Sequence, residues 1–513
     1  MKKKIFSILI FILTLVLLVG CGPKEYQVDP NDYPKYNTYY QIFVRSFADS
    51  DGDGIGDLKG IENKLDYIEE MGFTAIWLTP INPTDSYHGY DVIDYKKINP
   101  EYGSMADLES LIKKAKAKGI DVILDMVFNH SSPNHKWHQL ASLNEEPYKG
   151  YYIYQSGSKK AFESFPGTRD LNLFNKDLKE ELKNVLLFYL EKGVAGFRFD
   201  AAKHYFVKTG YPEYSTAPDL EAGLFLKELK KAVKDEYPNT FFVGEYFDYN
   251  HQFYKDTYLG VDSLFNFEIA KMIRDKFSSG SGEMTNRLAK IYKDLESYNP
   301  DYIDTPFVNN HDLNRLATLI ASEDARKQAH AILLTLPGSP FIYYGDEIGM
   351  VGKLYQEGVN YQYTGKNLAG YGMVYDEYTR LPFIWEEGDS AQTTWFPDVS
   401  ISNNLTNISK GLEDSNSLAN YIKTLANLRK NNPALRFGNS FYPYQTNISL
   451  TIAFVRDFVE NDYSQTLLIV HNTQSSIYQV TENTIDLFGT KEVNPYGTYI
   501  GIINPTEREN FIK

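Results

Sequence analysis

Cysteine is almost absent from this sequence, since Cys21 is the only one among 513 residues. A lone cysteine excludes an intramolecular disulfide. Basic residues are also outnumbered, with 52 lysines and arginines against 67 aspartates and glutamates and a net charge of −15. A surface of this sign repels phosphate backbones and anionic lipids, and nucleic acid is therefore not expected as a partner.

A long apolar run spans residues 5–20, after three lysines and directly before Cys21. This order is typical of an export signal. A membrane-spanning anchor is the alternative, but the run is shorter than a span needs and no cluster of charges follows it. The segment Leu18-Val19-Gly20-Cys21 resembles a bacterial lipobox. It implies removal of the signal at 1–20, a lipid on Cys21, a polar tether at 21–35, and an exported protein anchored to the outer face of a bacterial membrane.

The body of the chain alternates short apolar runs with amphipathic segments, such as the helical spacing over residues 58–71. This alternation predicts parallel strands joined by helices, and eight such strands predict an α/β fold of the (β/α)₈ TIM-barrel type. The predicted strands are residues 38–44, 73–78, 122–127, 194–199, 240–243, 261–267, 302–308 and 340–344.

The domain organisation follows from where this alternation is interrupted. Residues 130–176, rich in Ser, Pro, Asn, His and Tyr, predict a small domain inserted after the third strand. The barrel then comprises residues 36–129 and 177–410. Residues 411–513 begin with an amphipathic segment and continue with period-two alternation, which predicts an antiparallel β-sandwich. Its expected strands are residues 450–454, 466–470, 477–480 and 498–503.

Four predicted barrel strands end in a carboxylate: Asp125, Asp200, Glu245 and Asp312. The carboxyl ends of barrel strands form one face, where active sites lie. Each residue alone could be a helix N-cap. Four like charges in one cavity, however, cost free energy unless a cation or a reaction intermediate compensates, and this favours a catalytic site.

The chemistry of glycoside hydrolysis matches this set, because it needs one ionised carboxylate and one protonated carboxyl group. Arg198 lies two residues before Asp200 and would point to the same side of its strand. Its guanidinium would favour the ionised form of Asp200. Glu245, in a drier setting near other carboxylates, would keep its proton more easily.

Four segments resemble, in order, the signature regions of the α-amylase family of glycoside hydrolases: DVILDMVFNH at 121–130, GFRFDAAKH at 196–204, FVGEYF at 242–247 and FVNNHD at 307–312. Four matches in order are far more specific than any one of them. The resemblance implies that Asp200 is the nucleophile, that Glu245 is the acid and then the base, and that Asp312 stabilises the oxocarbenium-like transition state.

The same resemblance implies contacts to an α-glucan substrate. Arg198 would orient the nucleophile, Tyr90 would stack on the reacting sugar, and Lys203 would bind on the leaving-group side. The complete set of implied substrate-binding residues is His88, Tyr90, Asp125, His130, Arg198, Lys203, His204 and His311.

The resemblance also bears on the bond that is cleaved. Ala201, together with Lys203-His204, resembles the pattern of enzymes that act on α-1,4 bonds. The segment TRDLN at 168–172 resembles a fifth family region but departs from it in the first two residues, which leaves pullulan or cyclodextrin cleavage open. We predict a monomeric, retaining, endo-acting α-amylase. A transglycosylase or maltogenic enzyme and a non-catalytic glucan-binding lipoprotein are the alternatives.

A calcium site is predicted at residues 49–57, where carboxylates alternate with glycines that allow tight turns. The twelfth position of the loop is Gly60 in place of the glutamate of an EF-hand. An acidic turn that caps the following helix is the alternative. The resemblance implies as Ca²⁺ ligands Asp49, Asp51, Asp53, the carbonyl of Ile55, and Asp57. It further implies a second Ca²⁺ held by Asn129, Asp170 and the carbonyl of His204.

Overall fold

The computed structural model describes residues 35–155, 160–206, 218–279, 283–354, 366–368, 372–396, 407–446 and 451–512. The predicted signal, Cys21 and nearly all of the predicted tether lie outside the described residues. Within the described part of the chain, no helix is both long enough and apolar enough to cross a membrane.

Seven parallel strands form the central sheet, in the order β8-β7-β6-β3-β2-β1-β9. Nearly every residue in them is buried, as expected when helices cover a parallel sheet. Their bounds are β1 Tyr39–Ile42, β2 Ala75–Leu78, β3 Asp121–Met126, β6 Gly196–Phe199, β7 Phe241–Gly244, β8 Ser263–Leu264 and β9 Phe341–Tyr343.

The predicted strand at 302–308 is reduced to two isolated parallel bridges, Phe265 to Thr305 and Phe307 to Phe341. Prediction of a full strand there was wrong, and Pro306 gives the reason, because proline has no N–H to donate to a ladder. The carbonyl of Pro306 still accepts a hydrogen bond from Phe341 at 2.9 Å. These contacts connect β8 to β9 and close the sheet, which confirms the (β/α)₈ barrel.

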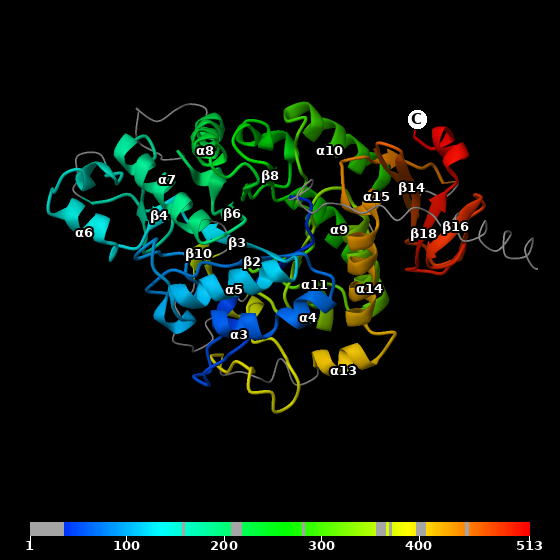
Figure 1. The fold of residues 1–513 in the computed structure, drawn as a ribbon, viewed down its shortest axis with the longest axis horizontal. Coiled ribbons are helices and arrows are strands. Elements are labelled where there is room, and N and C mark those ends of the chain that lie inside the picture. Colours follow the sequence, from blue (N-terminus) through cyan, green and yellow to red (C-terminus); the bar gives the residue numbers. More distant parts are fainter. Residues whose placement is uncertain are drawn as a thin grey trace, which may run out of the picture.

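Helices surround the barrel (Figure 1). The predicted helix at 58–71 is divided at Lys64 into α3 and α4, and the side chain of Asp57 caps α3 by accepting from Gly60 N. The main helices around the sheet are α3 Leu58–Asn63, α4 Leu65–Glu70, α5 Met105–Ala117, α7 Lys176–Glu191, α8 Pro218–Lys234, α9 Phe267–Ser279, α10 Thr285–Tyr298, α12 Glu323–Thr335 and α14 Leu418–Asn431.

An excursion leaves the barrel between β3 and α7. It contains β4 His130–Ser131, α6 Lys136–Ser142 and β5 Arg169–Asp170, and β4 pairs with β5 in antiparallel fashion. Figure 1 shows α6 at one end of the molecule, with the C-terminal sheet at the opposite end.

The C-terminal strands form an antiparallel sheet in the order β12-β13-β14-β18-β16, beside a two-stranded ribbon of β15 and β17. Alternation along β13 sends Ile452 and Phe454 into the core shared with the barrel, and Ala453 and Val455 into a separate core that includes Val480 and Val493. The β-sandwich prediction is confirmed. Its strands are β12 Tyr442–Pro443, β13 Thr451–Glu460, β14 Tyr463–Asn472, β15 Tyr478–Gln479, β16 Thr484–Phe488, β17 Glu492–Val493 and β18 Thr498–Ile503.

Candidate active site

Arg198 lies at the centre of the predicted site and contacts three of the four strand-end carboxylates. Its Nη1 donates to Asp125 at 2.8 Å and to Asp200 at 2.7 Å. Its Nη2 pairs with Glu245 at 3.0 Å. The parallel register places Asp125 beside Arg198 on adjacent strands, so the sheet itself brings these charges together. Arg198 is 1% exposed, and its positive charge compensates the clustered carboxylates.

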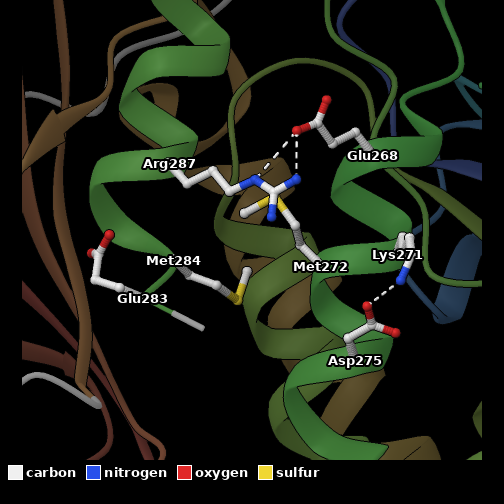
Figure 2. Close-up of a pocket in the computed structure, with 7 residues that line it drawn as sticks. All are labelled: Glu268, Lys271, Met272, Asp275, Glu283, Met284 and Arg287. Atoms are coloured by element: carbon white, nitrogen blue, oxygen red, sulfur yellow. Dashed lines mark hydrogen bonds and ion pairs between the residues drawn. The ribbon is translucent and has the colours of Figure 1, made fainter. Parts of the chain in front are cut away.

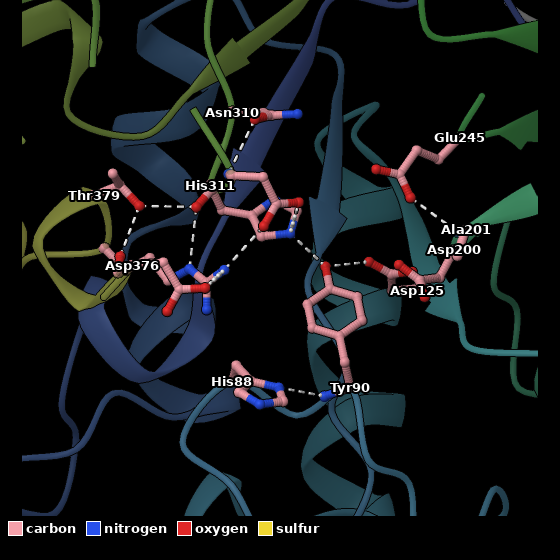
Figure 3. A network of polar contacts seen from close by, with 12 residues as sticks. His88, Tyr90, Asp125, Asp200, Ala201, Glu245, Asn310, His311, Asp376 and Thr379 are labelled. Atoms are coloured by element: carbon pink, nitrogen blue, oxygen red, sulfur yellow. Dashed lines mark hydrogen bonds and ion pairs between the residues drawn. The ribbon is translucent and has the colours of Figure 1, made fainter. Parts of the chain in front are cut away.

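A sharp turn follows Asp200 and connects it to Glu245. Ala201 has a φ of +50°, in the left-handed region, and its N–H donates to Glu245 Oε2 at 2.8 Å. Left-handed backbone is costly for β-branched and bulky residues, which suits a small side chain at this position. The turn therefore directs a backbone donor at the carboxylate of Glu245, as Figure 3 shows.

Burial raises the pKa of Glu245 to about 7, against the opposing effect of Arg198 and with the help of the negative charges of Asp200 and Asp312. Burial likewise raises the pKa of Asp125 to about 7, although Arg198 lowers it. A carboxyl group with such a pKa is about half protonated at neutral pH, so its protonated form is available to act as a general acid.

A chain of hydrogen bonds connects three of the implied substrate residues. The Tyr90 hydroxyl donates to Asp125 Oδ2 at 3.0 Å and lies 2.7 Å from His311 Nε2. His311 Nδ1 lies 2.7 Å from the side-chain amide of Gln41, and the rings of Tyr90 and His311 are stacked with centroids 5.4 Å apart. Gln41 was not predicted, although a polar amide within the apolar run of the first barrel strand could have indicated a contact with the site.

Asp312 is the most open of the four carboxylates, with a side chain that is 41% exposed. Arg380 donates to its Oδ1 at 3.0 Å and is itself fully buried. Arg380 also pairs with Asp376 at 2.9 Å and donates to the Tyr87 hydroxyl at 2.9 Å. Arg380 was missed from the sequence, because it ends no strand and belongs to none of the four segments.

The remaining implied residues lie at different depths around this centre. His130 is 3% exposed, and its Nε2 lies 3.0 Å from the backbone carbonyl of Tyr90, so it contacts Tyr90 from the protein interior. His88 Nδ1 lies 3.1 Å from Tyr90 N. His204 is exposed, and the ring of Phe165 lies 5.2 Å from it and 5.1 Å from His130.

Lys203 joins the loop that follows Asp200 to the loop that follows Glu245. Its ammonium donates to the carbonyl of Phe247 at 2.9 Å and to Asp248 at 2.7 Å. Two loops that are distant in sequence are therefore tied together at the edge of the site.

The acidic loop brings ligand atoms of Asp49, Asp51 and Asp57 within 4.8 Å of one another. Burial raises the pKa of Asp57, and the charge of Asp51 raises it further. Carboxylate oxygens are the hard ligands that Ca²⁺ prefers, and a bound cation would offset the repulsion between these negative charges. Asp53 lies outside this group, and its carboxylate accepts from Ile55 N at 2.7 Å.

The implied second site contains two buried residues, Asn129 and Asp170. Pairing of β4 with β5 brings them close, since Leu171 N donates to Asn129 O at 3.0 Å. The carboxylate of Asp170 accepts from Ser164 N at 2.9 Å. Across the described residues, the Asp49 loop alone gathers three acidic or histidine ligand atoms.

Comparison with known proteins gives consistent results. A sequence model described as the α-amylase catalytic domain matches residues 41–438. Alpha-amylase 3 of Dictyoglomus thermophilum is 36% identical over 462 residues, which are 85% of each chain. A 4-alpha-glucanotransferase of Thermotoga neapolitana is 33% identical over 343 residues, 61% of this chain and 72% of that protein. The crystal structure of an α-amylase from H. orenii superposes with a TM-score of 0.76 at 32% identity, covering 91% of this chain and 97% of the other.

Proposed function

The chain belongs to the α-amylase family of glycoside hydrolases, and we propose that it cleaves internal α-1,4-glucosidic bonds of starch and maltodextrins with net retention. One observation carries the proposal. A single guanidinium, that of Arg198, binds both Asp200 and Glu245, and burial raises the pKa of Glu245 to about 7. The pair therefore provides a candidate nucleophile and a candidate acid.

In the proposed mechanism, Asp200 attacks the anomeric carbon while Glu245 gives its proton to the departing glycosidic oxygen. Glu245, now ionised, then takes a proton from water, which attacks the β-glycosyl enzyme and releases Asp200. Retaining enzymes hold the two carboxyl groups about 5–5.5 Å apart and inverting enzymes about 6.5–9.5 Å apart. Binding to one guanidinium favours the shorter separation. Asp312 would stabilise the positive charge that develops on the sugar ring.

The substrate contacts proposed for the reacting sugar follow the geometry of the site. Tyr90 is held by His311 and Asp125 and by the backbone contact to His130, so its ring is rigidly placed. Rigid aromatic faces suit stacking on a sugar. Lys203 and His204, at the opening beyond Asp200, would contact the glucose on the leaving-group side.

A second candidate function is transfer of the glycosyl group to another sugar. Similarity to a 4-alpha-glucanotransferase supports it. Hydrolysis and transfer share one covalent intermediate and differ in which acceptor reaches it. Product analysis from a single maltooligosaccharide separates them, because only transfer gives chains longer than the substrate.

Calcium is proposed as a structural cofactor at the loop of Asp49, Asp51 and Asp57. The ion would neutralise three mutually close carboxylates and hold the turn that precedes α3. Asp53 and the carbonyl of Ile55 would complete its ligands. A second Ca²⁺ at Asn129 and Asp170 is proposed on the resemblance and on the proximity of these two residues.

Lipid anchoring through Cys21 is proposed from the lipobox. The first described residues support an orientation for the anchored enzyme. Lys35 pairs with Asp262 at 2.6 Å, just before β8, and Asn37 donates to Asp121 at 2.9 Å, at the start of β3. Both partners lie at the amino ends of strands, opposite the catalytic face, so the tether would leave the active site facing away from the membrane. Replacement Cys21→Ser should move the protein from the membrane fraction to the medium.

The central test is reducing-end release from soluble starch by the chain from Gly22 onward, compared with Asp200→Asn. We expect maltooligosaccharide products from the wild type and a loss of at least about 1,000-fold in the variant, as for other catalytic groups that act as a unit. Activity that survives Asp200→Asn would contradict the assignment of the nucleophile. Absence of any release by the wild type would contradict the proposed substrate.

A further inference from the structure

A hollow of about 240 Å³ lies beside the catalytic loops, and none of the residues predicted from the sequence lines it. Its walls include Tyr249, Leu313 and three charged residues of α9, namely Lys271, Arg274 and Asp275. Leu313 directly follows Asp312, and Tyr249 follows Glu245 by four residues, a distance of at most about 14 Å along an extended chain. The hollow therefore lies between the two loops that carry the general acid and the transition-state stabiliser.

The loop that carries Tyr249 is tied to the loop that follows Asp200. Lys203 donates to the carbonyl of Phe247 and to Asp248, two residues that precede Tyr249 on this loop. In the proposed mechanism, Glu245 gives its proton to the departing oxygen and Lys203 contacts the departing glucose. The loop that Lys203 holds would therefore border the path of the departing chain.

The side chains of the hollow combine an aromatic face with hydrogen-bonding groups. Tyr249 is 45% exposed, and the ring of Phe247, which is 44% exposed, lies 5.5 Å from it. The Lys271 ammonium lies 5.9 Å from the Tyr249 ring, and Arg274, half-buried, donates to the carbonyl of Asn314 at 3.3 Å. Amphipathic rings beside fixed donors and acceptors suit the apolar faces and hydroxyl groups of glucose units.

A neighbouring hollow on the other side of the Lys271–Asp275 pair provides a contrast (Figure 2). It lies between α9 and α10 and is smaller, about 100 Å³. Methionines and an ion pair between Arg287 and Glu268 at 2.8 Å line it, with no aromatic ring among its lining residues. Of these two hollows between described residues, the one at Tyr249 combines the connection to the catalytic loops with the chemistry for a sugar.

We propose that the hollow at Tyr249 is a distal binding site for the glucan chain on the leaving-group side, occupied by glucose units beyond those that contact Lys203. This inference rests on the proposed glucan hydrolysis. It makes Tyr249 a determinant of chain-length preference, because only substrates that extend beyond the cleavage point reach its ring.

The test measures kcat/KM for a series from maltotriose to maltoheptaose in the wild type, Tyr249→Ala and Tyr249→Phe. Tyr249→Ala should lower kcat/KM roughly tenfold for the longest substrate, equivalent to about 1.4 kcal/mol, and leave the shortest unchanged. Tyr249→Phe keeps the ring and should retain most of the activity. Phe253→Ala is the matched control, since Phe253 is 53% exposed on the same loop but does not line the hollow.

An equal loss for short and long substrates in Tyr249→Ala, or no loss for the longest, would overturn the proposal. The wild type in the same assay tests the proposed function separately. If the wild type cleaves none of these sugars, titration calorimetry with maltoheptaose and maltotriose still tests whether the hollow at Tyr249 binds a glucan. Tyr249→Ala should then weaken binding of the long sugar alone, and equal binding of maltoheptaose by wild type and variant would refute the site.

Discussion

Arg380 donates a hydrogen bond to the carboxylate of Asp312 at 3.0 Å, although the two residues are 68 positions apart in the chain. The same guanidinium donates through Nε to the backbone carbonyl of His311 at 3.1 Å. Arg380 thereby fixes both the backbone and the side chain of the His311-Asp312 turn. The Asp312 side chain is 41% exposed, and the contacts with Arg380 and with His311 Nε2, which lies 3.1 Å from Asp312 Oδ2, restrict its position in the open site.

Replacement of Arg380 by lysine should lower kcat by about 10- to 100-fold with a smaller change in KM, because a lysine cannot reproduce the fork and a 1 Å displacement of a catalytic group costs about this much. The measurement is steady-state kinetics on maltoheptaose well below the unfolding temperature. Arg429→Lys is the control, since Arg429 is equally buried but donates only to backbone carbonyls such as Leu334 and Gly338. A kcat reduced as much in Arg429→Lys as in Arg380→Lys would mean that loss of any buried arginine explains the effect.

The pH profile should have a basic limb near pH 7. Burial and the nearby carboxylates raise the pKa of Glu245 to about 7. In the proposed mechanism, Glu245 carries the proton for the leaving group below this pH and has lost it above, so kcat/KM on starch should fall about tenfold per pH unit on the basic side.

An aryl maltoside separates Glu245 from other groups that titrate in the same range, such as Asp125. A phenolate of low basicity leaves without protonation, so Glu245→Gln should keep a fast glycosylation step on this substrate, measured as a burst of phenolate, and the basic limb should be absent from that step. Its steady-state turnover should fall, because the base for the second step is missing. A basic limb of unchanged position in Glu245→Gln would assign it to another residue.

Calcium should stabilise the fold through the acidic loop. At a Ca²⁺ concentration about 100 times the dissociation constant, binding adds about 2.7 kcal/mol to the free energy of unfolding. We expect EGTA to lower the melting temperature of the wild type and to have little effect on Asp49→Asn or Asp51→Asn. Asp53→Asn should retain more of the response, because Asp53 lies outside the group of close ligands. Equal melting temperatures of the wild type in Ca²⁺ and in EGTA would argue against the site.

Asp262 should make the barrel sensitive to acid. Burial alone would raise its pKa, but the three lysines Lys230, Lys35 and Lys234 lower it to about 2. A folded-state pKa below the unfolded value adds stability that is present above about pH 4 and is lost as the pH falls toward 2. A shift of this size corresponds to about 2 kcal/mol.

Urea unfolding at pH 6 and pH 3 measures this contribution. Asp262→Asn should be less stable than the wild type at pH 6, and the difference should shrink at pH 3. Asp66→Asn is the control, because Asp66 pairs with Lys118 but its side chain is 88% exposed, and exposed pairs contribute little. A difference between wild type and Asp262→Asn that is the same at both pH values would refute the role of this carboxylate.

Sequence patterns predicted the architecture well where the signal was local. Buried strands in a parallel barrel are continuous apolar runs, and seven of the eight expected runs form strands. The eighth, around Pro306, was misjudged because its composition is that of a strand while proline removes a donor. The division of the 58–71 helix at Lys64 was also missed, since its apolar spacing continues through the break.

By itself, the sequence determined which carboxylates meet. Asp125, Asp200 and Glu245 directly end parallel strands, and the topology of a barrel sends all such ends to one face. The sequence also placed Arg198 beside Asp200, but only the tertiary structure decided what else surrounds these carboxylates. Arg380, Gln41 and the hollow at Tyr249 come from segments with no common motif, and their contacts depend on how long loops fold over the barrel. Local sequence specifies the direction of a strand end, whereas the packing of distant loops is specified only when the whole chain has folded.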